Sequence, residues 1–204
     1  MSQANKQKCP YCDSFLDTIP KRKKKCPSCG ESIYVRLGKL LTEEDAIMYD
    51  WAERLAEFGV NLQHILNERE SLSAKFGFRA PINDVIWSVM NKAIPNQSNP
   101  NKLEFLYGKM ANFLYDEGKD PSGIVEEMKK VQIKRLQREV AKHKSSFVEV
   151  IIKVHTCNDH LVCENCKKAS SRSFTVEEFL EEMPIPGECT NPTGCRCWIG
   201  IEMA

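Results

Sequence analysis

The residues with the clearest chemical potential are four cysteines near the N-terminus, arranged as two Cys-x-x-Cys pairs. Cys9-Pro-Tyr-Cys12 and Cys26-Pro-Ser-Cys29 are separated by thirteen residues. Each pair forms a short turn that can point both sulfurs at one place, and proline after the first cysteine presets that turn. Four thiolates of this kind suit one tetrahedral Zn²⁺ ion. The spacing therefore predicts a zinc site with the ligands Cys9, Cys12, Cys26 and Cys29.

This double turn resembles the zinc-ribbon family, in which short antiparallel strands support two metal-binding knuckles. Segments 14–16 and 32–35 lie where such strands would fall, and we predict them as strands. The resemblance implies a structural metal but selects no partner, because ribbons bind DNA, RNA or protein. Disulfides are the alternative use of these cysteines. Since the N-terminal residues show no apolar signal segment, we expect a cytoplasmic protein, and a reducing cytosol favours thiolate–metal bonds.

A second group of cysteines lies in the last quarter of the chain, with none between the two groups. Its first paired motif is Cys163-Glu-Asn-Cys166. A helix is predicted to follow, because Thr175 and Glu178 form a capping box before apolar residues at helical spacing. Pro184 and Pro186 end that helix and turn the chain back, which can bring the final cysteines beside the first pair.

We interpret this second group as another zinc site. The expected ligands are Cys163, Cys166, Cys195 and Cys197. Cys189 is the main substitute for one of the last pair, and Cys157 and His160 are close enough in sequence to compete. Six cysteines exceed the needs of a four-ligand site, so the choice among them stays open. Two Zn²⁺ ions per chain are expected.

The order of motifs at residues 150–204 resembles the cysteine-rich end of phage head-morphogenesis (minor head) proteins. The shared features are the Cys-x-x-Cys pair, a Ser173-Phe-Thr helix start, a proline-rich turn and Cys195-Arg-Cys197. That family commonly has a His-Pro step before its Cys-x-Cys, where this chain has Cys189-Thr-Asn-Pro192. The resemblance implies a shared metal-binding module, and it makes a protein-assembly factor of phage or prophage type the alternative function.

Charge is distributed in blocks, although the formal net charge is only +1. Residues 1–40 hold nine Lys/Arg against three Asp/Glu, and residues 129–144 hold seven against one. Residues 41–128 hold eight against fifteen, and residues 145–204 hold five against nine. Two basic blocks in an otherwise acidic chain favour a nucleic-acid partner.

The segment between the cysteine groups is predicted to be helical. Apolar residues recur at helical spacing over segments 43–58, 62–76, 82–93, 103–117 and 122–143, where 62–76 can hold one or two short helices. A β-branched run at 147–154 predicts a strand. We therefore expect a mainly α fold with three parts. These are a zinc ribbon (1–40), an α-helical domain (41–145) and a cysteine-rich α+β metal-binding module (146–204).

The last long helix has two faces. Val125, Met128, Leu136 and Val140 form the apolar one, and the opposite side bears a row of cations four residues apart. A solvated surface is the usual outcome for such charges, and contact with backbone phosphates is the functional alternative. The candidate nucleic-acid-binding residues, named here the basic ridge, are Lys130, Lys134, Arg138 and Lys142.

No enzyme is expected. The sequence shows no phosphate-binding loop, no paired catalytic carboxylates and no metal site with an open position, so no catalytic residue and no small-molecule substrate is assigned. A thiol nucleophile at Cys163, served by His160 and Asp159, is disfavoured because Cys163 already has metal-binding neighbours. No apolar run approaches the roughly 18 residues of a membrane helix. The expected role is a non-enzymatic zinc-binding adaptor for nucleic acid or a protein complex.

Overall fold

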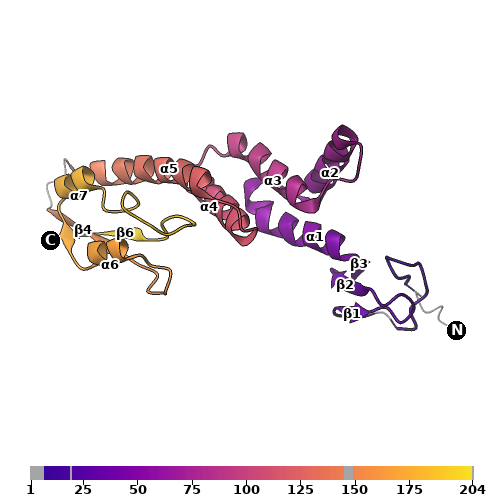
Figure 1. Cartoon of the computed structure of the whole chain (residues 1–204). Helices are drawn as coiled ribbons and strands as arrows, with labels where there is room; N and C mark the ends of the chain where they lie inside the picture. The colour runs from indigo at the N-terminus through magenta and orange to yellow at the C-terminus, as the bar shows by residue number, and fades with distance from the viewer. Residues whose placement is uncertain (1–6, 19, 145–148, 204) are drawn as a thin grey trace. The chain divides into compact units, whose positions relative to one another are not determined.

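The computed structural model describes residues 7–18, 20–144 and 149–203 and divides the chain into two compact units, Met1–Ala93 and Ile94–Ala204 (Figure 1). Within the described residues there are seven α-helices and two three-stranded antiparallel sheets. The expectation of a mainly α fold therefore holds only loosely. The division into 1–40, 41–145 and 146–204 stays a prediction about which segments fold independently.

The ribbon at the start of the first unit contains β1 (Lys24–Lys25), β2 (Ser32–Arg36) and β3 (Lys39–Leu41), in the order β1-β2-β3. The predicted strand at 32–35 is confirmed as part of β2. The prediction for 14–16 is wrong, because only Phe15 pairs, in a single bridge to Lys8. Ser14 instead closes the first knuckle, where its carbonyl accepts a hydrogen bond from the Cys9 N–H at 2.9 Å. β3 was not predicted.

Three helices complete the first unit: α1 (Glu43–Leu55), α2 (Leu62–Phe76) and α3 (Ile82–Ala93). Thr42 caps α1, because its hydroxyl accepts a hydrogen bond from the Asp45 backbone N–H at 3.2 Å. A 3₁₀ turn (Ala56–Phe58) follows α1 and ends at Gly59, whose φ of 81° is the left-handed conformation that glycine adopts without strain. The segment at 62–76 is one continuous helix.

Two charged residues are buried among these helices. Glu68 accepts a hydrogen bond from Ser88 Oγ at 2.6 Å and forms an ion pair with Lys92. Arg69 donates to Glu44 at 2.6 Å. Burial raises the pKa of Glu68, but its bonds to Lys92 and Ser88 outweigh burial and leave the pKa below its ordinary value. Glu68 is therefore a charged, fully partnered structural residue.

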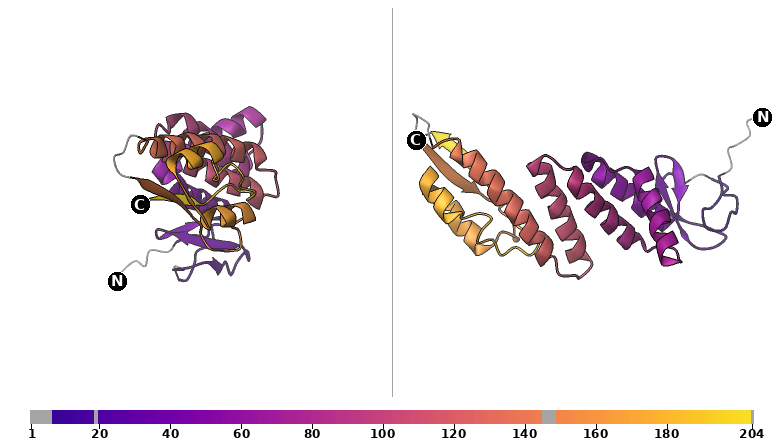
Figure 2. Two further views of the ribbon diagram at one scale, coloured as in Figure 1. Left: turned by 90° about the vertical axis from the view of Figure 1, so that its left-hand side faces the viewer. Right: turned by 90° about the horizontal axis from the view of Figure 1, so that it is seen from above.

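The second unit begins with a 3₁₀ turn (Ile94–Asn96) and two long helices, α4 (Pro100–Asp116) and α5 (Ser122–Ala141). The two helices pack against each other and lie side by side in the right-hand view of Figure 2. Asn99 caps α4 with Pro100 in its first turn. The predicted limits of both helices are correct to within a few residues.

The cysteine-rich end of the second unit contains a sheet in the order β5-β4-β6. Its strands are β4 (Val150–His155), β5 (Ser173–Phe174) and β6 (Trp198–Met203), and the helices are α6 (Glu164–Ser170) and α7 (Val176–Glu182). β4 confirms the predicted strand from residue 150 onward, whereas Phe147 and Val148 lie outside the described residues. The capping box of α7 is present as predicted. β6 and α6 were not predicted.

The apolar face of α5 belongs to the core of this cysteine-rich end. Leu136 and Val140 pack in one buried cluster with Ile152, Phe174 and Phe179. The same cluster contains three of the cysteines: Cys166, Cys189 and Cys195. The long basic helix and the second cysteine group therefore share a single core, which links the structure of one to the other.

Candidate metal centres

The four N-terminal cysteines converge at one point. Cys9 Sγ lies 3.9 Å from Cys29 Sγ, and Cys12 Sγ lies 3.8 Å from Cys26 Sγ. All four sulfurs lie within 4.8 Å of one another. With Zn–S bonds of about 2.3 Å, the edge of a ZnS₄ tetrahedron is about 3.8 Å. The observed distances match that edge, so the group is suited to one tetrahedral metal ion.

Backbone N–H groups of the two knuckles stabilise negative charge on the sulfurs. The Tyr11 N–H donates to Cys9 Sγ at 3.5 Å. In the second knuckle, the N–H groups of Cys29 and, to a smaller extent, Ser28 lower the pKa of Cys26 to about 6. A lowered pKa favours the thiolate, which is the form that binds metal. The fold of the second knuckle thus favours the thiolate at Cys26, whereas burial raises the pKa of Cys9.

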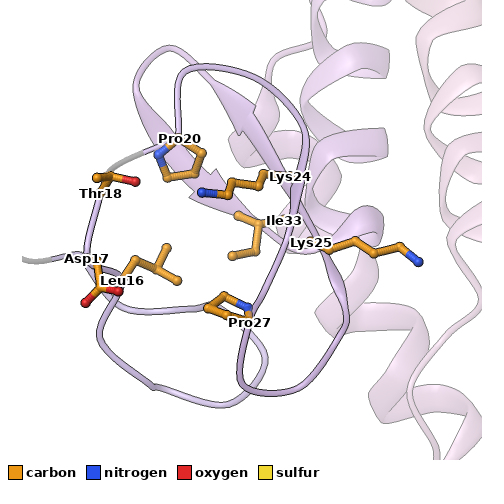
Figure 3. A pocket seen from close by; sticks show the side chains of 8 residues that line it. All are labelled: Leu16, Asp17, Thr18, Pro20, Lys24, Lys25, Pro27 and Ile33. Atoms are coloured by element: carbon orange, nitrogen blue, oxygen red, sulfur yellow. The ribbon is translucent and has the colours of Figure 1, made fainter.

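A shallow pocket of about 50 Å³ lies beside this site in the ribbon. Figure 3 shows Leu16, Pro27 and Ile33 facing one another across it, while the Lys25 side chain points away. The pocket is far below the roughly 300 Å³ of an ordinary small-molecule site. The ribbon also carries an exposed basic loop at Lys21–Lys25, and residues Pro20 to Lys24 line an open hollow of about 610 Å³.

The C-terminal cysteines also converge, as the turn after α7 was expected to make them do. Cys163 Sγ lies 3.9 Å from Cys189 Sγ, and Cys166 Sγ lies 3.8 Å from Cys195 Sγ. Sulfurs within 4.8 Å of one another form two groups of three, Cys163/Cys166/Cys189 and Cys166/Cys195/Cys197. These distances again suit metal binding. Cys189, expected only as a substitute, lies beside both cysteines of the first pair.

Two of these thiols, Cys189 and Cys163, have lowered pKa values. The hydrogen bond from the Cys195 thiol, together with the Asn191 N–H, lowers the pKa of Cys189 to about 5. Burial raises the pKa of Cys163, but N–H groups of Thr190 and Cys166 outweigh burial and lower it. The pKa values of Cys166 and Cys195 are raised, so these two thiols keep their protons. Metal binding to them therefore releases protons to water.

The loop that holds Cys195 is fixed to the long helices. The side-chain amide of Gln132 on α5 donates to the Cys195 carbonyl at 3.0 Å and to Glu104 on α4 at 2.9 Å. Gly194 packs so closely on Met128 that an added Cβ would lie 1.8 Å from Met128 Cε. Sequence reasoning missed these supporting residues. The available signal was a polar Gln132 within the otherwise apolar row of Met128, Leu136 and Val140.

The basic ridge follows the side of α5 opposite to its buried face. Lys130, Lys134, Arg138 and Lys142 are all exposed. Lys130 pairs with Glu127 at 2.6 Å. In the part of the chain that the structure describes, no carboxylate forms an ion pair with the other three cations. Most of the ridge is thus free to meet an anionic partner.

Comparisons with family models, curated proteins and solved structures returned no match to this chain. The likeness to zinc ribbons and to phage head proteins therefore rests on the cysteine motifs alone. Among the described residues, none of the helices has the length and apolar character needed to cross a bilayer.

Proposed function

We propose that this protein is a non-enzymatic zinc-binding adaptor that binds nucleic acid through the basic ridge of α5. The observation that carries the proposal is the exposed row Lys134, Arg138 and Lys142, none of which pairs with a described carboxylate. Cations that already have carboxylate partners gain little from a phosphate, whereas unpaired ones release condensed counterions when they bind it. The ridge is therefore an effective phosphate-binding surface.

The length of the ridge fits an extended phosphate backbone. Residues four apart on a helix differ in height by about 6 Å, so the row from Lys130 to Lys142 spans about 18 Å. One strand of a duplex rises about 3.4 Å per nucleotide, which gives roughly five nucleotides along the ridge. Such contacts fix position but select no sequence, and the expected binding is sequence-tolerant.

The two metal centres have a structural role in this proposal. In the ribbon, four cysteines fill the coordination sphere of one ion, which leaves no open position for a substrate. The exposed run Lys21–Lys25 gives the ribbon a second basic surface. At the other end, the cysteine-rich core holds the opposite face of α5 and so presents the ridge on a rigid helix.

Reversing two charges of the ridge tests the proposal. Lys134→Glu with Arg138→Glu should abolish binding to a fluorescent single-stranded or duplex oligonucleotide at low salt. Glutamate is as good a helix former as lysine or arginine, so α5 should persist. Replacing Lys134 and Arg138 by glutamine should lower the slope of log affinity against log salt by about two, one for each lost phosphate contact.

A matched control separates the ridge from total charge. Lys75→Glu with Lys168→Glu changes the net charge equally at exposed positions of α2 and α6, and it should leave most of the affinity intact. Equal losses in the two charge-reversal variants would refute a localised interface. No binding by the wild type at low salt would refute nucleic-acid binding altogether and favour the protein-assembly factor of phage type.

A further inference from the structure

The two cysteine groups differ in how their sulfurs are arranged. At the N-terminus all four sulfurs lie within 4.8 Å of one another, as the ligands of one ion must. At the C-terminus five sulfurs form two groups of three, and Cys166 belongs to both. A single four-coordinate ion would gather its ligands into one group of four. Two groups that share one sulfur are instead the arrangement of two ions joined by a bridging thiolate.

We infer that the C-terminal cluster holds two Zn²⁺ ions bridged by the Cys166 thiolate. One ion takes Cys163 and Cys189 as further ligands, and the other takes Cys195 and Cys197. Cys166 is the most deeply buried of the five, with 1% of its surface exposed, as a shared central ligand should be. The inference raises the zinc content from the expected two ions per chain to three, and it does not depend on nucleic-acid binding.

A sixth thiol is available to complete one of the two coordination spheres. Cys157 Sγ lies 3.5 Å from the carbonyl oxygen of Arg196, the residue between two of the clustered cysteines. It also lines a cavity of about 10 Å³ together with Cys163, Cys166, Cys189 and Cys197. That volume is at the lower limit for one water molecule and suits bare metal ions.

The number of donors agrees with this assignment. Two four-coordinate ions offer eight positions, and six thiolates with Cys166 as the bridge fill seven of them, three more than one ion could use. A single ion would use four thiolates and leave two of the six thiols without a metal bond. Each thiol that binds gives its proton to water, and no electron transfer is involved.

Counting the metal ions in the intact chain tests the inference. Native mass spectrometry of zinc-loaded protein, dialysed against a weak chelator, should show three Zn²⁺ ions per chain. Cys12→Ser serves as a control that should remove only the N-terminal ion and leave two. Cys166→Ser should remove both C-terminal ions and leave one. A wild-type chain with two ions, or a Cys166→Ser chain that keeps two, would overturn the binuclear centre.

A measurement on the wild type covers the case in which Cys166→Ser fails to fold. In protein loaded with ¹¹³Cd, the C-terminal cluster should give two cadmium resonances in the region of thiolate coordination. Scalar coupling between the two nuclei should split both resonances, because the Cys166 sulfur bonds to each ion. One unsplit C-terminal resonance would show a mononuclear site and refute the inference.

Discussion

Cys163→Ser should unfold the cysteine-rich end of the second unit while the first unit stays folded. Cys26→Ser should unfold the ribbon of the first unit while the second unit stays folded. The free energy of zinc binding at a structural site is about 10–16 kcal/mol, comparable to the whole stability of a typical domain. Loss of one ligand removes much of it. At the C-terminus the loss also exposes a core built around Cys166, Cys189 and Cys195.

The effect of Cys163→Ser should extend into α5. From the sequence alone, the helices of 41–145 are expected to survive loss of either metal site. In the structure, however, Leu136 and Val140 pack in the same cluster as the cysteines, so α5 loses its partner when that cluster opens. Helices α1, α2 and α3 belong to the other unit and should keep their structure.

Hydrogen exchange resolved by peptide segment measures both variants directly. In Cys163→Ser, protection should be lost in β4, β6 and α5 and retained in α1 to α3. In Cys26→Ser, protection should be lost in the ribbon and retained in β4 and β6. Loss of protection throughout the chain in either variant would contradict the division into two units.

Gly194→Ala should destabilise the second unit by about 2 to 5 kcal/mol. Gly194 has a φ of 95°, a conformation that costs an L-residue roughly 1–2 kcal/mol. The new methyl group would also lie 1.8 Å from Met128 Cε, and overpacking a filled site costs about 1–3 kcal/mol. Because Gly194 precedes Cys195, the strain acts directly on the metal-binding loop.

A second glycine of the same unit provides the control. Gly123 lies in α5, and an added Cβ there meets no atom within 4 Å. Gly123→Ala should therefore raise stability by up to about 1 kcal/mol, since alanine favours the helix. Denaturant unfolding of both zinc-loaded variants, followed by circular dichroism, measures the difference. Equal stabilities would show that the Gly194–Met128 contact does not hold the loop.

Features that depend on neighbouring residues were predictable from the sequence. The Cys-x-x-Cys turns, the Thr42 cap and the Thr175 capping box each act within a few residues, and the structure contains all of them. The short β3 and the glycine-containing β6 were missed, because pairing with another strand rather than local propensity stabilises them.

Long-range features of the second unit escaped the sequence for the same reason. Nothing local shows that Cys189 lies beside Cys163, or that the Cys195 carbonyl accepts a hydrogen bond from Gln132, sixty-three residues away. The helical period did identify the two faces of α5, but not the core against which the apolar face packs. Which sulfurs share a metal is likewise a tertiary property.

Purification of the tagged full-length chain from cells at low salt, with and without nuclease, tests the central claim most directly. Nucleic acid should copurify with the wild type, high salt or nuclease should remove it, and Lys134→Glu with Arg138→Glu should prevent its capture. Absorbance at 260 and 280 nm together with gel analysis gives the readout. Wild-type protein free of nucleic acid, with a protein partner that survives nuclease, would contradict the account and support an assembly factor.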